Sequence, residues 1–96
     1  MATIIKVEQL ATTEIEQYDC DFTDHLETGD TVASATATHT PPSGAATTPV
    51  VGTISANVVP VKVGALAVTG LHYVSVLATT TGGLKHLIRL EIPVNF

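Results

Sequence analysis

A chain of 96 residues with a net charge of −5 is long enough for one domain with a thin core. Its nine acidic residues all precede Thr31 except Glu91, and its four basic residues are dispersed, which argues against nucleic-acid binding. The single cysteine excludes an internal disulfide, and no apolar run reaches the roughly 18 residues of a membrane helix. The N-terminal sequence lacks the apolar stretch of a secretion signal, so we expect synthesis in the cytoplasm of the producing cell.

The N-terminal residues 1–13 form a separate piece, because Thr12-Thr13 interrupts a short mixture of apolar and polar residues. The sequence leaves two alternatives for this piece. It is either a first strand of the domain's own sheet or an extended arm that adds to the edge of a neighbour's sheet. We expect its apolar side chains to contact a partner: Ile4, Ile5, Val7 and Leu10. The remaining residues, 14–96, are predicted to form one β-sandwich domain.

The body of the domain begins with a predicted strand over residues 15–22. Its apolar side chains alternate with acidic ones, which is typical of a strand with one buried face: Tyr18, Cys20 and Phe22. An acidic connection follows over residues 23–30. We expect one helical turn there, with Thr23 as its N-cap and Leu26 directed inward.

A second predicted strand, built of small residues, covers residues 31–39. Pro41 and Pro42 end it and begin a loop, because neither residue can donate a backbone hydrogen bond to a sheet. Loops carry many binding residues, and we expect Pro41 and Pro42 to contact a partner.

Four further strands are predicted over residues 50–59, 61–68, 71–80 and 84–94. Pro60 is expected to end the first of them or to lie at a sheet edge. Thr81-Gly82-Gly83 supplies the turn of a final hairpin. The 71–80 strand is apolar on both faces, as in a central strand that is covered on both sides or contacts a partner. Together, about seven short antiparallel strands predict an all-β, immunoglobulin-like sandwich, with a small barrel as the alternative.

The residues that could perform chemistry lack the spacing that chemistry requires. The acidic residues between positions 19 and 30 do not fit an EF-hand, and a solvated strand face accounts for them. Cys20 is in phase with the buried positions of its strand, which indicates a small hydrophobic residue rather than a nucleophile. The histidines lack zinc-ligand spacing, and we expect His72 and His86 to face each other across the last hairpin. We therefore predict no enzyme, no cofactor and no metal site.

Three sequence blocks follow one another in a characteristic order: Tyr18 with Asp21-Phe22, then Gly29-Asp30-Thr31-Val32-Ala33-Ser34, then Thr79-Thr80-Thr81-Gly82-Gly83. In this order they resemble the short immunoglobulin-like structural proteins of tailed bacteriophages. The resemblance covers roughly residues 18–93. The chain departs from that pattern at Phe22, where Trp is usual, and at His72, where an inward Tyr is usual.

This resemblance implies a virion structural protein, most simply one that decorates or cements the outer surface of the capsid. Its expected partners are the major capsid protein and neighbouring copies of itself, with no nucleic acid or membrane involved. A neck or tail adaptor is one alternative. A carbohydrate-binding module for the host surface is another, although the chain has few aromatic side chains to stack on sugars. We expect the protein to be made in the host bacterial cytoplasm and used in the virion.

Overall fold

The computed structural model describes residues 2–95, which contain seven strands and one short 3-10 helix, η1 (Thr23–His25). The strands are β1 (Ala2–Lys6), β2 (Glu16–Asp21), β3 (Val32–Thr40), β4 (Val50–Val51), β5 (Val58–Val63), β6 (Gly70–Thr80) and β7 (Lys85–Val94). Within this described range, no helix has the length and apolar character needed to cross a membrane.

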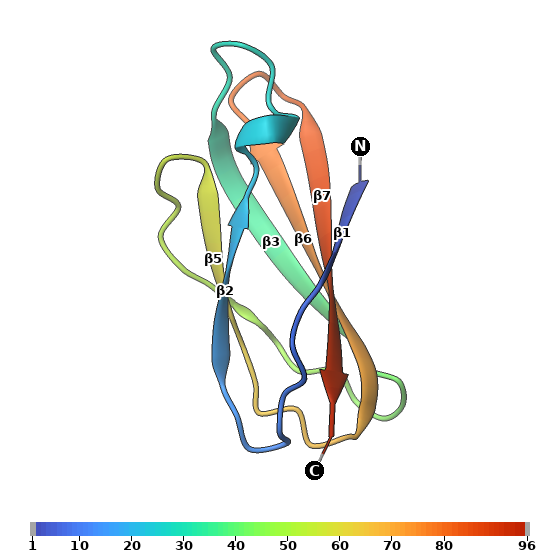
Figure 1. Cartoon of the computed structure of the whole chain (residues 1–96). Helices are drawn as coiled ribbons and strands as arrows, with labels where there is room; N and C mark the ends of the chain where they lie inside the picture. Colours follow the sequence, from blue (N-terminus) through green and yellow to red (C-terminus); the bar gives the residue numbers. More distant parts are fainter. Residues whose placement is uncertain (1, 96) are drawn as a thin grey trace.

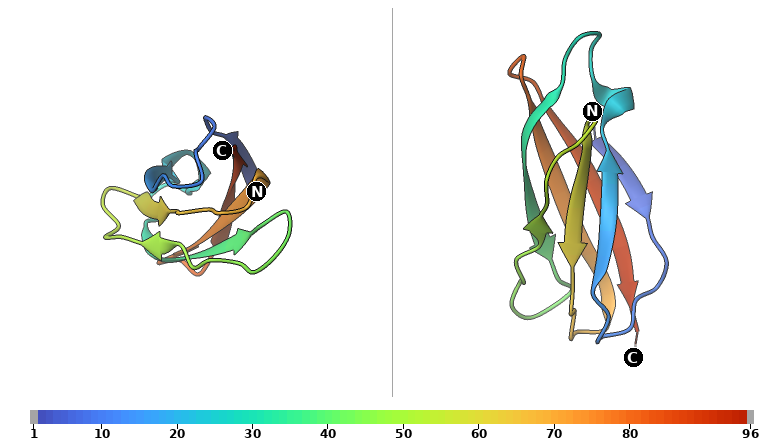
Figure 2. Two further views of the ribbon diagram at one scale, coloured as in Figure 1. Left: turned by 90° about the horizontal axis from the view of Figure 1, so that it is seen from below. Right: turned by 90° about the vertical axis from the view of Figure 1, so that its left-hand side faces the viewer.

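The strands form two sheets that pack face to face (Figures 1 and 2). One sheet has the order β1-β7-β6-β3 and the other the order β2-β5-β4. Without β1, these are the C-F-G and B-E-D orders of an immunoglobulin domain. The predicted immunoglobulin-like β-sandwich is therefore confirmed. The N-terminal segment is an extra strand of the larger sheet, β1, and it runs parallel to β7, a direction that the sequence left open.

The core lies between the two sheets and is built from small aliphatic side chains around one aromatic ring. Phe22 is fully buried, and the inward residues of β6 and β7 cover it from the other sheet. Buried side chains alternate along four strands, β2, β5, β6 and β7, as the sequence predicts for β2, β6 and β7. The buried members include Cys20, Val59, Val61, Val63, His72, Val74, Val76, Ala78, Ile88, Leu90, Ile92 and Val94. The final hairpin pairs β6 with β7 over their full length, as the sequence predicts.

The segment predicted as a third strand, residues 50–59, is instead a hairpin. Ala56 and Asn57 both have positive φ angles, 51° and 65°, and reverse the chain between β4 and β5. Pro60 does not end a strand but lies inside β5. The Gly52 N–H donates to the Pro60 carbonyl oxygen (2.8 Å), but Pro60 has no N–H to donate in return. The pairing ends there, and β4 has only two residues.

Two other predicted boundaries differ from the structure. The strand expected over residues 61–68 ends at Val63, because Gly64 has a φ of 135° and lies against the Glu14 backbone, where a Cβ would come within 2.4 Å of the carbonyl oxygen. Thr23 is not the N-cap of η1 but its first residue. The carboxylate of Asp21 accepts the Thr23 N–H (2.9 Å) and hydroxyl (2.6 Å) instead.

The N-terminal segment lies in the domain's own sheet. β1 pairs with β7 from Ala2–Leu87 to Lys6–Glu91, and the chain continues along β7 as far as Leu10. The Leu10 N–H donates to Pro93 and its carbonyl accepts from Asn95, both at 2.9 Å. The Leu10 side chain is only 5% exposed and belongs to the core, while its contact with a partner remains a prediction.

The burial of Leu10 predicts a measurable stability contribution from the N-terminal segment. Leu10→Ala should lower the free energy of unfolding by about 2–5 kcal/mol, because the lost methyl groups leave a cavity. Ile4→Ala is the matched control, since Ile4 is 54% exposed in the neighbouring strand and its truncation should cost little. Urea unfolding of the two variants makes the comparison. Equal, small losses in both would show that this segment is not part of the folded core.

Candidate partner-binding site

The two sheets leave a seam along one side of the sandwich. Because β1 pairs with β7, it does not extend the smaller sheet, and β2 remains the edge strand of that sheet. Figure 1 looks onto the seam, with β2 on its left and β1 on its right. Two strand edges thus flank an opening into the interior. An immunoglobulin domain commonly fills this position with a first strand paired to strand B.

The outer edge of β2 carries unpaired backbone groups. Phe22 directly follows β2 and donates its N–H to the carbonyl oxygen of Asn57, just before β5 (3.0 Å). Because the backbone groups of successive strand residues point to opposite sides, this bond shows which residues of β2 face β5. Tyr18 and Cys20 therefore direct their N–H and C=O groups to β5. The backbone groups of Gln17, Asp19 and Asp21 point away from β5, and none of the described residues pairs with them.

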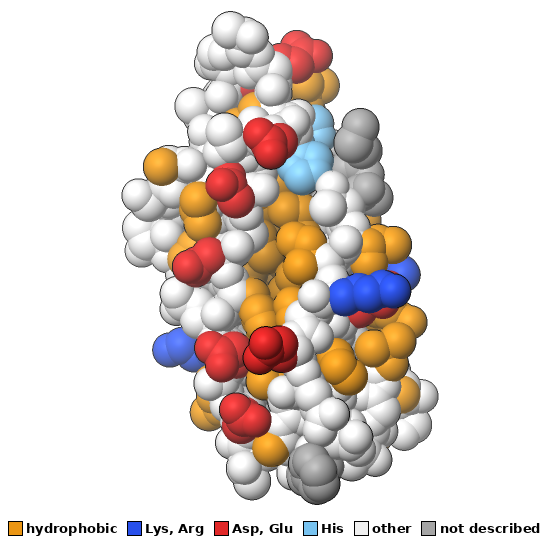
Figure 3. Space-filling view, viewed as in Figure 1, with side chains coloured by type: hydrophobic (Ala, Val, Ile, Leu, Met, Phe, Trp, Pro, Cys, Tyr) orange, Lys and Arg blue, Asp and Glu red, His pale blue; other side chains and the backbone are white. Residues whose placement is uncertain are grey.

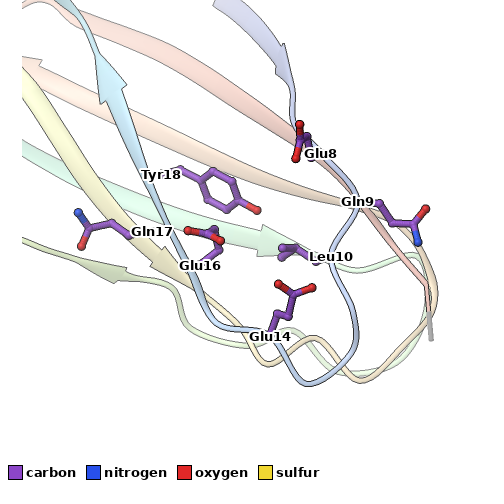
Figure 4. A pocket seen from close by; sticks show the side chains of 7 residues that line it. All are labelled: Glu8, Gln9, Leu10, Glu14, Glu16, Gln17 and Tyr18. Atoms are coloured by element: carbon purple, nitrogen blue, oxygen red, sulfur yellow. The ribbon is translucent and has the colours of Figure 1, made fainter.

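A pocket of about 330 Å³ lies at one end of the seam, between β2 and the segment that follows β1 (Figure 4). The Tyr18 ring extends from β2 into this pocket, towards Leu10, with the Glu14 and Glu16 carboxylates beside it. Its lining combines carboxylate, amide, aliphatic and phenol groups: Glu8, Gln9, Leu10, Glu14, Glu16, Gln17 and Tyr18. We call this the Tyr18 pocket.

The Tyr18 hydroxyl is a buried polar group within this pocket. It has no hydrogen-bond partner among the described residues. Burial, and then the negative charges of Glu16 and Glu14, raise the pKa of Tyr18 to about 12, so the phenol stays protonated. An unpaired buried hydroxyl costs about 1–3 kcal/mol. The pocket therefore offers an unused oxygen within it and carboxylates around it, a combination that suits the cationic head and apolar stem of Lys or Arg.

The negative charge continues from the pocket along β2. Figure 3 shows acidic side chains in a column beside a recess in which hydrophobic side chains are visible. Asp19 and Asp21 are both exposed on the outward face of β2. The hydrogen bonds from Thr23 lower the pKa of Asp21, so this carboxylate remains charged near neutral pH. The free edge is thus anionic along most of its length.

The partner contacts predicted from the sequence do not gather in one place. Ile4 is exposed and lies opposite Arg89 of β7. Ile5 and Val7 lie on the other face of this segment, where Val7 packs against the core. Pro41 and Pro42 lie in the loop after β3, which is the opposite edge strand of the larger sheet from β1.

Sequence reasoning missed the acidic residues of the Tyr18 pocket: Glu8, Glu14 and Glu16. Glu8 and Glu14 lie in the connection between β1 and β2, and Glu16 is the first residue of β2. The available signal was Glu14 and Glu16, which lie four and two residues before Tyr18, but these residues form a site with Glu8 only once β1 is paired with β7.

The motif blocks around Asp30 and the last hairpin have a structural role. Asp30 accepts hydrogen bonds from the Thr81 hydroxyl (2.8 Å) and the Gly82 N–H (3.0 Å), and so joins the two blocks at one end of the larger sheet, where β3 and β6 are neighbours. Hydrogen bonds from the Thr80 and Thr81 side chains, then from the Gly82 and Thr31 backbones, lower the pKa of Asp30 to about 2. Within residues 2–95, no three His, Cys, Asp or Glu side chains are grouped so that they could hold a metal ion.

No model of a protein family matches this chain, and no curated protein matches it significantly.

Two buried histidines form a second polar cluster. The Thr47 N–H donates to His39 Nδ1 (2.9 Å), so the neutral His39 ring carries its proton on Nε2. His39 Nε2 then donates to His72 Nδ1 (2.8 Å), and His72 Nε2 donates to the Val68 carbonyl (2.5 Å). His72 does not face His86 as the sequence predicted, because His72 lies opposite Ile92 and His86 opposite Ala78.

This chain of hydrogen bonds has no place for an extra proton. Burial, and then the proximity of His72, lower the pKa of His39 below its usual value of 6.5. Protonation of either ring would replace an acceptor nitrogen with a second donor and break a hydrogen bond to Thr47 or between the rings. Both histidines are already committed to one another, to a loop residue and to the backbone, and this arrangement indicates a structural role.

The histidine pair predicts a loss of stability in mild acid. A lowered folded-state pKa means that the unfolded chain takes up the proton first, so the stabilisation is complete above the unfolded pKa of 6.5 and falls as the pH decreases towards the folded value. The slope should approach about 1.4 kcal/mol per pH unit for each such proton. Urea unfolding between about pH 7.5 and pH 5.5, where most carboxylates stay ionised, measures it. His39→Phe should flatten this dependence, and an unchanged slope in that variant would contradict the assignment.

Proposed function

We propose that this protein is a structural component of a tailed-phage virion that binds the outer surface of the capsid. Its partners are the major capsid protein and neighbouring copies of itself. The observation that supports this most strongly is the seam beside β2, where an unpaired strand edge, an acidic pocket and apolar side chains lie together on a rigid sandwich. Such a combination is suited to holding another polypeptide.

The chemistry of the side chains favours docking over catalysis. Cys20 is 1% exposed, and burial followed by the charge of Asp19 raises the pKa of its thiol to about 11. A nucleophilic cysteine requires the opposite, an accessible thiol with a lowered pKa. The buried histidines are engaged with each other rather than with Cys20. These properties support the proposal of a passive role.

The aromatic side chains favour protein docking over carbohydrate binding. Phe22 is fully buried, and the Tyr18 ring lies in the pocket with its hydroxyl buried. The Arg89 guanidinium covers the Tyr73 ring at 4.5 Å from its centroid. Phe22 therefore offers no face to a sugar, Tyr18 faces into the pocket rather than lying flat on the surface, and Arg89 occupies a face of Tyr73. The exposed hydrophobic side chains are instead aliphatic and dispersed: Ile4, Ile5, Ile15, Val50, Leu71 and Leu84.

Repeated weak contacts would give such a protein its affinity. A symmetric shell presents the same site many times, and contacts that are linked on the shell reinforce one another. A decoration protein therefore needs neither a large interface nor a deep ligand pocket. A neck or tail adaptor would use the same kinds of contact but would occupy one location in the particle.

The proposal predicts where the protein lies in the particle. Purified virions should contain the chain in a fixed, high proportion to the major capsid protein, as measured by quantitative mass spectrometry. A cryo-EM map should show its density on the outer surface of the head, and particles from a phage with the gene deleted should lack that density. Density confined to the neck or tail would favour the adaptor. The complete absence of the chain from virions would contradict the proposal.

A further inference from the structure

We infer that the free edge of β2 and the Tyr18 pocket together bind an extended segment of a partner protein, in which Lys or Arg alternates with apolar residues. The segment adds to the smaller sheet as a new strand beside β2. This inference rests on the proposed function and deepens it, because it assigns the chemistry of the capsid segment that the protein holds. It commits to another protein rather than to a second copy of this chain.

The backbone of β2 is prepared for such an addition. Gln17, Asp19 and Asp21 direct their N–H and C=O groups away from β5, and no described residue pairs with them. An edge strand of this kind is a template for a further strand, which satisfies its backbone groups with main-chain hydrogen bonds. The incoming strand would occupy the seam between β2 and β1.

The faces of β2 determine which side chains the new strand carries. On the inward face, Tyr18 and Cys20 border the hydrophobic interior, so every second residue of the partner should be apolar. On the outward face, Asp19 and Asp21 are exposed and charged, so the residues between should be cationic. Opposite charges across neighbouring strands contribute roughly 0.2–1 kcal/mol for each pair.

The Tyr18 pocket lies on the inward face at the Glu16 end of β2, so the one inward residue of the added strand that reaches it should be Lys or Arg instead of an apolar residue. A Lys or Arg head there would meet carboxylates from Glu8, Glu14 and Glu16, while its stem packs beside the Tyr18 ring and Leu10. The buried Tyr18 oxygen could accept a hydrogen bond that it lacks in the free protein. A cation therefore satisfies the pocket in a way that neither an anion nor an apolar group does.

The same charges argue against a second copy of this chain as the occupant. Two β2 edges paired with each other would bring Asp19 and Asp21 of one copy against the same residues of the other. Like charges on paired strands are destabilising. The alternative explanation of these acids is that they only prevent aggregation at an open edge. That explanation predicts no specific binding of a basic strand, so the two can be separated by experiment.

The test uses the full-length protein and short capped peptides as probes. One peptide alternates lysine with valine, a second alternates glutamate with valine, and a third alternates lysine with serine. Isothermal titration calorimetry measures binding, and NMR hydrogen exchange follows the individual amides of β2. Only the lysine–valine peptide should bind well, because it alone supplies both the charge and the apolar face. Its binding should slow exchange at Gln17, Asp19 and Asp21, while Tyr18 and Cys20, already bonded to β5, should change little.

Two matched variants separate strand addition from simple charge attraction. Asp19→Pro and Asp19→Ala remove the same charge, but only the proline also removes the N–H that points to the free edge. Asp19→Pro should weaken binding by at least about tenfold relative to Asp19→Ala, because a main-chain hydrogen bond is lost and the added strand is obstructed. Circular dichroism confirms that both variants are folded.

The inference is overturned by equal binding of both variants, by equal binding of the lysine–serine peptide, or by binding without protection at the three outward amides. It is also overturned if no basic peptide binds. These outcomes are distinct from failure of the proposed function. If the protein is found on phage heads but binds no peptide, only the strand-addition site is disproved. If it binds the peptide but is absent from virions, only the capsid is disproved as its partner.

Discussion

The parallel pairing of β1 with β7 determines the form of the functional surface. It commits the N-terminal segment to the larger sheet and leaves β2 at the edge of the smaller one. The chain must then cross from β1 to β2, and Leu10 closes the core on the way. The acidic residues of this crossing meet those of β2 around Tyr18. The open edge, the pocket and the charge are consequences of one choice of strand pairing.

The parts of the fold that follow from local patterns were predictable. The Tyr18–Phe22 alternation and the final hairpin with its Thr81-Gly82-Gly83 turn both lie as the sequence predicts. In each case, side chains two residues apart share one face, so a single strand carries the whole signal. The resulting number of strands and the spacing of the turns were sufficient for the sandwich class.

The remainder depends on contacts between distant segments. Nothing local distinguishes a β1 strand paired in parallel with β7 from an arm bound to a neighbour, because both require the same apolar residues. The turn at Ala56 and Asn57 was missed because positive φ angles are unusual for Ala, whereas Gly would have marked the turn. The His39–His72 contact depends on the register of two strands, and the pocket depends on a crossing connection. These features become visible only when the sheets are assembled.

The central claim, that β2 has an unpaired outer edge in the free protein, can be measured by amide hydrogen exchange without any ligand. An unpaired outer edge predicts rapid exchange at Gln17, Asp19 and Asp21 and slow exchange at Tyr18, Cys20 and Phe22, whose N–H groups face the β5 side. The parallel pairing also predicts cross-strand nuclear Overhauser effects between β1 and β7. Slow exchange at the three outward amides, with contacts from β1 to β2, would show that the edge is already filled and would contradict the account.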